Sequence, residues 1–256
     1  MHYNVYVNGC SWTFGGELEG LEGDHEYREK HRWSQVIEDR CGVTVFNDSE
    51  NGISNDGIVR KTMQWFAAGN TCDIALVQMT LMNRMEWMNE KTNKKYNLSP
   101  GNVIRNELRS AYDSIVFNKL NPGLIAASRA YLESLYNYRW GIHHRNKQQW
   151  ILEKILEENT QDYQFIHLMN HIVFDRKDND WYPYLKKEIF PLYNIIPWEA
   201  RDDEESKLYC KNYFKDHPKE YKYSSYNGSH PSALGHQKIA EHFINNCDYL
   251  KVCASK

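Results

Sequence analysis

Short apolar runs of strand length alternate along this chain with segments of helical periodicity. The runs cover residues 3–7, 43–46, 73–79 and 164–169 and are rich in Val, Ile, Tyr and Phe, which favour strands. Residues 33–40, 58–68, 124–138 and 147–159 carry apolar side chains at helical spacing, and a last helix is predicted after Pro231. This alternation is typical of a parallel sheet with helices on both faces. The predicted fold is therefore α/β, with three α/β/α layers and a central, mainly parallel sheet.

The length of the chain allows one large hydrophobic core. It has 256 residues, of which 41% are apolar, and we expect a single domain over residues 1–256. Between about 175 and 226 the periodic pattern gives way to Tyr-rich and charged sequence with four prolines. We expect an irregular insertion there, over the C-terminal edge of the sheet.

Charge and hydropathy exclude some classes of partner. Lys and Arg total 31 against 34 acidic residues, so there is no basic field to hold a nucleic acid, and none is expected as a partner. No apolar run approaches the roughly 20 residues of a membrane span, so no membrane partner is expected. No signal peptide is recognisable after Met1, which predicts a cytoplasmic protein, or a virion-associated one if it is viral. The oligomeric state is left open.

Neither the cysteines nor the histidines form a metal-binding pattern. The six cysteines include no C-x-x-C pair, and buried reduced thiols are expected. His167 and His171 are four residues apart, but His167 falls in a predicted strand, and no third ligand is evident. We therefore expect no metal and no cofactor.

Polar loops follow the first three predicted strands. Ligands bind α/β sheets at the carboxyl ends of their strands, so these loops are where a site is expected. Residues 8–11 form a tight, glycine-containing turn that presents the hydroxyl of Ser11. The second loop, residues 47–56, contains Gly52 and Asn55, and the third, residues 80–84, contains Thr80, Asn83 and Arg84.

A histidine near the C-terminus is a candidate base for Ser11. A serine hydroxyl is a weak nucleophile until a base removes its proton. His230 precedes Pro231, which places it on a loop just before the last helix. His217 also precedes a proline, but the residue three positions before it is Phe214, which cannot orient an imidazole. His236, near the start of the last helix, is expected to be a packing or capping residue.

Together these segments resemble the SGNH hydrolases, also called the GDSL family, over most of the chain. Gly-Cys-Ser at 9–11 corresponds to the family's Gly-Asp-Ser block. Gly52 corresponds to the glycine of the second block, and Asn-Gly-Ser-His-Pro at 227–231 corresponds to the final Asp-x-x-His-Pro block. The third block, Gly-x-Asn-Asp, is poorly matched by residues 78–84. There the resemblance leaves Thr80 and Asn83 as alternative oxyanion donors.

The resemblance implies an SGNH/flavodoxin-like fold and a serine esterase, with Ser11 as nucleophile, His230 as base, and the amides of Ser11 and Gly52 in the oxyanion hole. Asn227 stands where the family has the triad aspartate. Replacing that carboxylate by an amide lowers turnover about 10⁴-fold in the best-studied protease triad, so weak activity is expected. Cys10 stands in place of the aspartate beside the nucleophile, which is expected to be tolerable.

The expected substrate is a small-molecule or glycan ester, and the resemblance alone suggests a carbohydrate O-acetyl ester. Asn55 and Arg84 are candidate substrate contacts, although Arg84 also suits a surface ion pair. A second hypothesis is a binding or structural protein, such as a virion component, that keeps the fold and has lost the triad acid.

Overall fold

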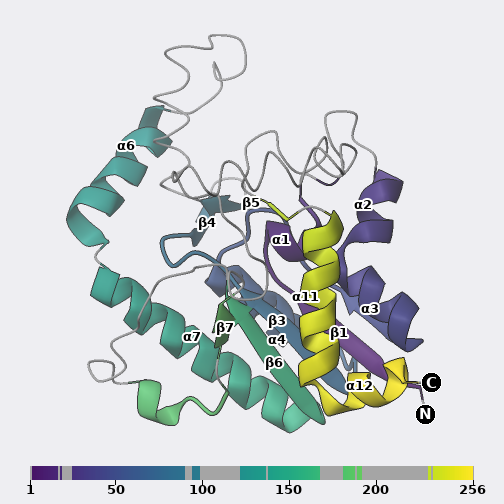
Figure 1. Cartoon of the computed structure of the whole chain (residues 1–256). Helices are drawn as coiled ribbons and strands as arrows, with labels where there is room; N and C mark the ends of the chain where they lie inside the picture. Colours follow the sequence, from purple (N-terminus) through teal and green to yellow (C-terminus); the bar gives the residue numbers. More distant parts are fainter. Residues whose placement is uncertain are drawn as a thin grey trace, which may run out of the picture.

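Five parallel strands form the central sheet, in the order β2-β1-β3-β6-β7 (Figure 1). The computed structural model describes residues 2–16, 18, 25–89, 94–98, 122–136, 138–167, 181–187, 189–191, 230–231 and 233–255. The strands of this sheet are β1 (Asn4–Asn8), β2 (Thr44–Asn47), β3 (Ile74–Met79), β6 (Asp162–His167) and β7 (Ile189–Pro191). The predicted α/β class with a parallel sheet is confirmed.

The central strand β3 is fully buried, and its neighbours β1 and β6 are buried at all but their first residues. Val5 of β1 lies opposite Val45 on one side and Ile74 on the other. All six residues of β3 are buried, because helices cover both faces of a parallel sheet. This explains why the sequence of β3 shows no alternation between apolar and polar residues.

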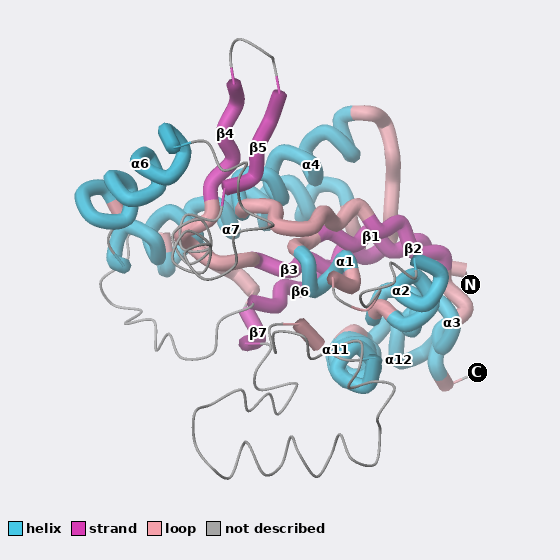
Figure 2. Tube along the Cα trace, turned by 90° about the horizontal axis from the view of Figure 1, so that it is seen from above, coloured by secondary structure: helices cyan, strands magenta, loops and turns pink. Residues whose placement is uncertain are grey.

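Helices form a layer on each face of the sheet (Figures 1 and 2). On one face α3 (Trp33–Cys41), α11 (Ala233–Asn246) and α12 (Asp248–Ala254) pack together, with α2 (His25–His31) beside them. On the other face α4 (Asn55–Ala67) packs against α7 (Tyr138–Asn159). None of the helices in the described part of the chain has the length and apolar character to cross a membrane.

The ends of two helices follow the local signals in the sequence. The Ser54 hydroxyl accepts a hydrogen bond from Gly57 N at 3.2 Å and so caps the start of α4. α3 ends at Gly42, whose φ of 61° is left-handed and whose N–H donates to Glu38 O at 2.9 Å.

The helical region before β6 differs from the prediction. Residues 124–138 were expected to form one helix, but α6 (Pro122–Ala130) runs into a π-helical turn at Tyr131–Leu135, and Tyr136 is extended. α7 begins at Tyr138 and not at 147. Its first half shows no apolar periodicity because polar residues such as Arg145 and Asn146 are buried there.

Three strands were not predicted. β4 (Met85–Asn89) and β5 (Lys94–Leu98) form an antiparallel hairpin of their own, which projects from the rest of the fold in Figure 2. β7 falls inside the stretch expected to be irregular, where a 3₁₀ turn (Tyr182–Tyr184) is also described. Most of that stretch, residues 175–226, lies outside the described residues, so its character stays a prediction.

Candidate active site

The strand order places a topological switch point between β1 and β3. The chain moves from β1 to β2 on one side and then crosses back to β3 on the other side. In open α/β sheets the crevice for a ligand lies at the carboxyl ends of the two strands at this point. The loop that carries Ser11 leaves β1 here, and Thr80 directly follows β3.

Ser11 is the first residue of α1 (Ser11–Phe14), a single helical turn. Cys10 O accepts from the N–H groups of Thr13 and Phe14 at 2.9 and 3.0 Å, and Gly15 ends the turn with a φ of 86°. The Ser11 side chain is buried, and its hydroxyl lies 3.9 Å from Cys10 Sγ, to which it donates. The N–H of Ser11 belongs to the first turn of the helix, where N–H groups have no intrahelical acceptor. It is therefore suited to bind an anionic oxygen.

The turn before Ser11 requires glycine at position 9. A methyl group on Gly9 would lie 2.7 Å from Gln78 Cβ and would also collide with the Thr13 hydroxyl. That hydroxyl donates to Gln78 Oε1 at 2.5 Å, and Asn8 Oδ1 accepts from Gly9 N at 2.7 Å. The turn is thus held against β3 by the close approach of Gly9 to Gln78 and by the Thr13–Gln78 hydrogen bond, and it is held at the end of β1 by the Asn8–Gly9 hydrogen bond.

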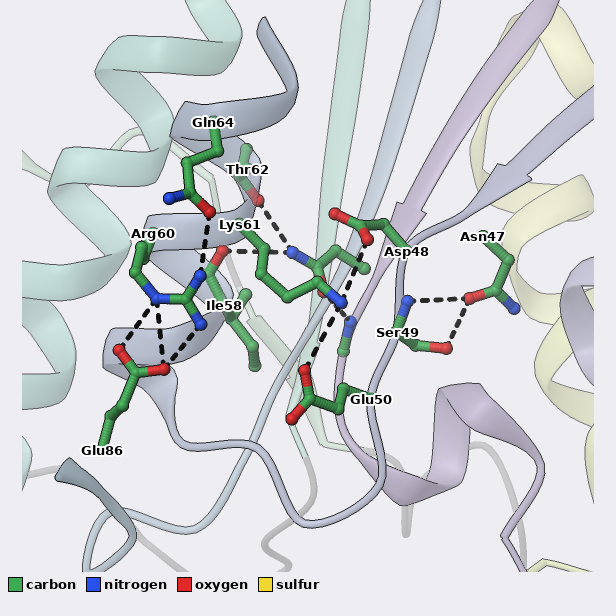
Figure 3. Close-up of polar contacts among 12 residues, drawn as sticks. Asn47, Asp48, Ser49, Glu50, Ile58, Arg60, Lys61, Thr62, Gln64 and Glu86 are labelled. Carbon is green, nitrogen blue, oxygen red and sulfur yellow. Dashed lines mark hydrogen bonds and ion pairs between the residues drawn. The ribbon is translucent and has the colours of Figure 1, made fainter. Parts of the chain in front are cut away.

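The second loop is joined to the first by the backbone. Glu50 N donates to Gly9 O at 3.1 Å, and Lys61 of α4 reaches across to Asp48 and Glu50, with N–O distances of 3.0 and 3.6 Å (Figure 3). Gly52 lies in this loop with a φ of 78°, and apart from its chain neighbours no atom of the described residues lies within 4 Å of the position its β-carbon would occupy. Glycine suits this left-handed backbone, and the space beside it is open.

Asn55 joins the second loop to the third. Its Oδ1 accepts from Thr80 N at 2.7 Å, and its Nδ2 donates to Thr80 O at 3.1 Å. Thr80 Oγ1 in turn accepts from Arg84 Nη1 at 2.8 Å. Asn83 is half-buried. The three loops that the sequence singled out therefore meet at one edge of the sheet.

His230 lies next to this group of loops, close to Gly16. A methyl group on Gly16 would lie 3.1 Å from Ser11 Cβ and 3.3 Å from His230 Cδ2. The His230 ring is half-buried, and its centroid lies 6.3 Å from that of Trp12. The structure therefore brings Ser11 and His230 to either side of Gly16. Asn227, the predicted third member, lies outside the described residues.

A second histidine lies behind His230 in the interior. His236 of α11 is fully buried, and its Nδ1 accepts from Trp33 N at 3.1 Å, which agrees with the packing role expected for it. Burial, together with the nearby charges of His230, His31 and Arg32, lowers the pKa of His236 to about 3. An accepting Nδ1 places the proton of the neutral ring on Nε2.

Sequence reasoning missed two residues that shape the site. Gly16 leaves room beside both Ser11 and His230, where a methyl group would be crowded, and the pair of glycines at 15–16 was the available signal. Asn8 is fully buried, and besides accepting from Gly9 N it donates to Ile58 O at 3.1 Å and to Thr62 Oγ1 at 3.0 Å. A polar residue at the end of an apolar strand was the signal for Asn8.

No cluster of three or more His, Cys, Asp or Glu side chains in the described part of the chain is arranged to hold a metal ion. The five described cysteines are buried and free.

No family model and no curated protein matches this chain. Similar solved structures include a lipolytic protein of the G-D-S-L family from Veillonella parvula (9% identity, TM-score 0.39, covering 95% of this chain and 97% of that one). They also include a lipase from a goat rumen metagenome (14%, 0.43, 98% and 97%) and an acetyl xylan esterase from Butyrivibrio proteoclasticus (9%, 0.44, 97% and 66%). At such low identities and TM-scores, the likeness does not identify which residues of this chain act.

Proposed function

We propose that this chain is a serine ester hydrolase of the SGNH type. Ser11 Oγ attacks the ester carbonyl while His230 accepts the hydroxyl proton. The oxyanion of the tetrahedral intermediate is held by the amides of Ser11 and Gly52. His230 then returns the proton to the departing alcohol. In the second half of the reaction His230 accepts a proton from water, the water attacks the acyl-enzyme, and His230 returns the proton to Ser11 Oγ as the acid leaves.

The observation that carries the proposal is the approach of Ser11 and His230 to the same point beside Gly16. The two residues are 219 positions apart in the sequence, and the crevice between β1 and β3 is where an α/β fold binds its ligand. A helix cap alone, which is the simpler role for a serine after a glycine, requires no imidazole at this place.

Asn83 is the better candidate for the third oxyanion donor. The Thr80 N–H is already engaged by Asn55, which leaves Thr80 one donor, the hydrogen of the hydroxyl whose oxygen accepts from Arg84. The Asn83 carboxamide makes no hydrogen bond among the residues that the structure describes. A donor of this kind typically contributes about 10² to 10³ in rate, so Asn83→Ala is expected to slow hydrolysis by roughly that factor.

Asn227 in place of an aspartate predicts slow turnover. An amide orients the imidazole but does not stabilise the imidazolium that forms during the reaction. Asn227→Asp is therefore expected to raise kcat on 4-nitrophenyl acetate. No increase would indicate that another group, such as a backbone carbonyl, already orients His230. For the natural substrate we propose an O-acetyl ester of a carbohydrate.

A fluorophosphonate probe tests the proposal, because it labels only an activated serine. Labelling of the wild-type protein and its loss in Ser11→Ala are expected, while the matched variant Ser34→Ala, a buried serine on α3, keeps the label. If folded wild-type protein stays unlabelled and does not hydrolyse 4-nitrophenyl acetate, the alternative of a binding or structural protein with this fold is favoured.

A further inference from the structure

The guanidinium of Arg84 has no carboxylate partner in the described part of the chain. Arg84 follows β3 and is half-buried. Its Nη1 donates to Thr80 Oγ1 at 2.8 Å, while its Nε is buried and has no hydrogen-bond partner among the described residues. The ion pair that the sequence allowed for Arg84 is not found among them either.

Arg60, unlike Arg84, has hydrogen-bond partners on both sides of its guanidinium. Its Nε and Nη2 donate to the two carboxylate oxygens of Glu86 at 2.8 and 2.6 Å, and its Nη1 donates to Gln64 (Figure 3). The side of the guanidinium formed by Nε and Nη2 thus carries a bidentate carboxylate in Arg60. The same side of Arg84 carries no carboxylate of the described chain.

Arg84 is attached to the strand end that supports the nucleophile turn. Thr80, which binds its Nη1, directly follows β3. Gln78, two residues earlier, accepts a hydrogen bond from Thr13 of α1, the turn that begins with Ser11. The hydrogen bond to Thr80 therefore fixes the guanidinium at the switch point, on the same edge of the sheet as Ser11.

The Nε of Arg84 is enclosed, so a ligand reaches this guanidinium at its Nη end. Nη2 makes no hydrogen bond among the described residues and is not enclosed. A guanidinium also binds a planar carboxylate at this end, through two parallel hydrogen bonds from its two Nη atoms. We propose that Arg84 binds a carboxylate of the substrate, so that the preferred esters are anionic. This inference rests on the proposed ester hydrolysis and narrows its substrate class. Among glycan esters, that class consists of O-acetylated acidic sugars.

Matched pairs of esters test the preference. The first pair is 4-acetoxybenzoate, whose carboxylate is on the alcohol part, and its neutral methyl ester. The second pair is mono-4-nitrophenyl adipate, whose carboxylate is on the acyl part, and its neutral methyl ester. In at least one pair the wild-type kcat/KM is expected to be about tenfold or more higher for the carboxylate than for its methyl ester, mainly through KM.

Variants of Arg84 test whether this residue causes the preference for the anionic ester. The ratio of kcat/KM between the two members of the preferred pair is expected to fall about tenfold in Arg84→Gln and to be partly retained in Arg84→Lys. Arg40→Gln is the matched control, since it removes one positive charge from the exposed side of α3, where Arg40 pairs with Glu241. It is expected to keep the wild-type ratio.

Binding measured without turnover separates this inference from the proposed function. Calorimetry is expected to show that 4-acetoxybenzoate binds Ser11→Ala at least tenfold more tightly than it binds the double variant Ser11→Ala/Arg84→Gln. Hydrolysis of both members of each pair at equal rates, or a preference unchanged in Arg84→Gln, overturns the anionic substrate class and leaves the esterase intact. If the wild-type protein hydrolyses none of the four esters, the proposed esterase activity fails, and the calorimetric comparison alone decides whether Arg84 binds a carboxylate.

Discussion

The carboxamide of Asn55 pairs with both backbone polar groups of Thr80. Thr80 N donates to Oδ1 at 2.7 Å and Nδ2 donates to Thr80 O at 3.1 Å, and both residues are buried. Asn55 is also the candidate substrate contact predicted from the sequence, and that role stays a prediction. The contact that the structure shows is one that joins the start of α4 to the end of β3.

Replacing Asn55 with Ala is expected to lower the free energy of unfolding by about 1–3 kcal/mol, because it leaves the N–H and C=O of Thr80 buried without partners. Urea denaturation followed by circular dichroism measures the change. Asn70→Ala is the control, since Asn70 is exposed and makes one hydrogen bond to Trp65 O, and its cost is expected to stay within about 0.5 kcal/mol. Equal costs for the two variants would contradict the joining role.

Gly16→Ala is expected to slow the labelling of Ser11 by a fluorophosphonate by up to about 10²-fold, because the added methyl group displaces Ser11 or His230. Gly69→Ala is the contrasting variant. Its φ of 83° makes alanine costly by about 1 kcal/mol, but in the described part of the chain no atom beyond its chain neighbours lies within 4 Å of the new methyl group. Gly69→Ala should therefore lose stability and keep its labelling rate. Undiminished labelling of Gly16→Ala would show that the space between Ser11 and His230 is not critical.

The stability of the protein is expected to fall between neutral pH and pH 4. Burial lowers the pKa of His236 from 6.5 to about 3, so the unfolded chain takes up a proton in this range while the folded protein does not. The contribution of His236 to the free energy of unfolding is therefore complete above pH 6.5 and is lost progressively as the pH falls towards 3.

Urea midpoints at pH 7.5 and 4.5 measure this effect. The drop in midpoint should be smaller in His236→Gln than in the wild-type protein, while His2→Gln, which changes an exposed histidine, should keep the wild-type drop. The same drop in all three proteins would show that other groups cause the acid sensitivity.

The buried cysteines are expected to resist thiol reagents in the folded protein. Burial raises the pKa of the Cys72 thiol to about 12 and the pKa values of Cys41 and Cys247 to about 11, and only the thiolate reacts. In a Cys210→Ala variant at pH 8, Ellman's reagent should react slowly until urea unfolds the chain, and then with all five remaining thiols. Rapid reaction before unfolding would contradict this prediction.

The sequence predicted the parts of the fold that have strong local signals. β1, β2, β3 and β6 are short apolar runs, and α4 has both a capping serine and a terminal glycine. β7 was missed because a strand of three residues has too little pattern to detect. The first half of α7 was missed because its buried side chains are polar, and their burial depends on partners far away in the sequence.

The sequence predicts which loops form the candidate site, but it does not predict which residues of these loops contact one another. Gly9, Ser11 and Gly52 stand at strand ends, which the order of elements reveals. The role of Gly16 depends on the approach of His230 from the other end of the chain, and the engagement of Thr80 depends on Asn55. No local pattern encodes these distant pairings.

The two halves of the site come from opposite ends of the chain. β1, β2 and β3, with the three loops that follow them, are complete within the first 84 residues, whereas His230 precedes α11, which packs against α3. During synthesis the turn that carries Ser11 is therefore made long before His230, the base that we propose for it. Covalent labelling of Ser11 would then report that folding has been completed, since a nascent or truncated chain that holds the whole β1–β3 region still lacks the imidazole.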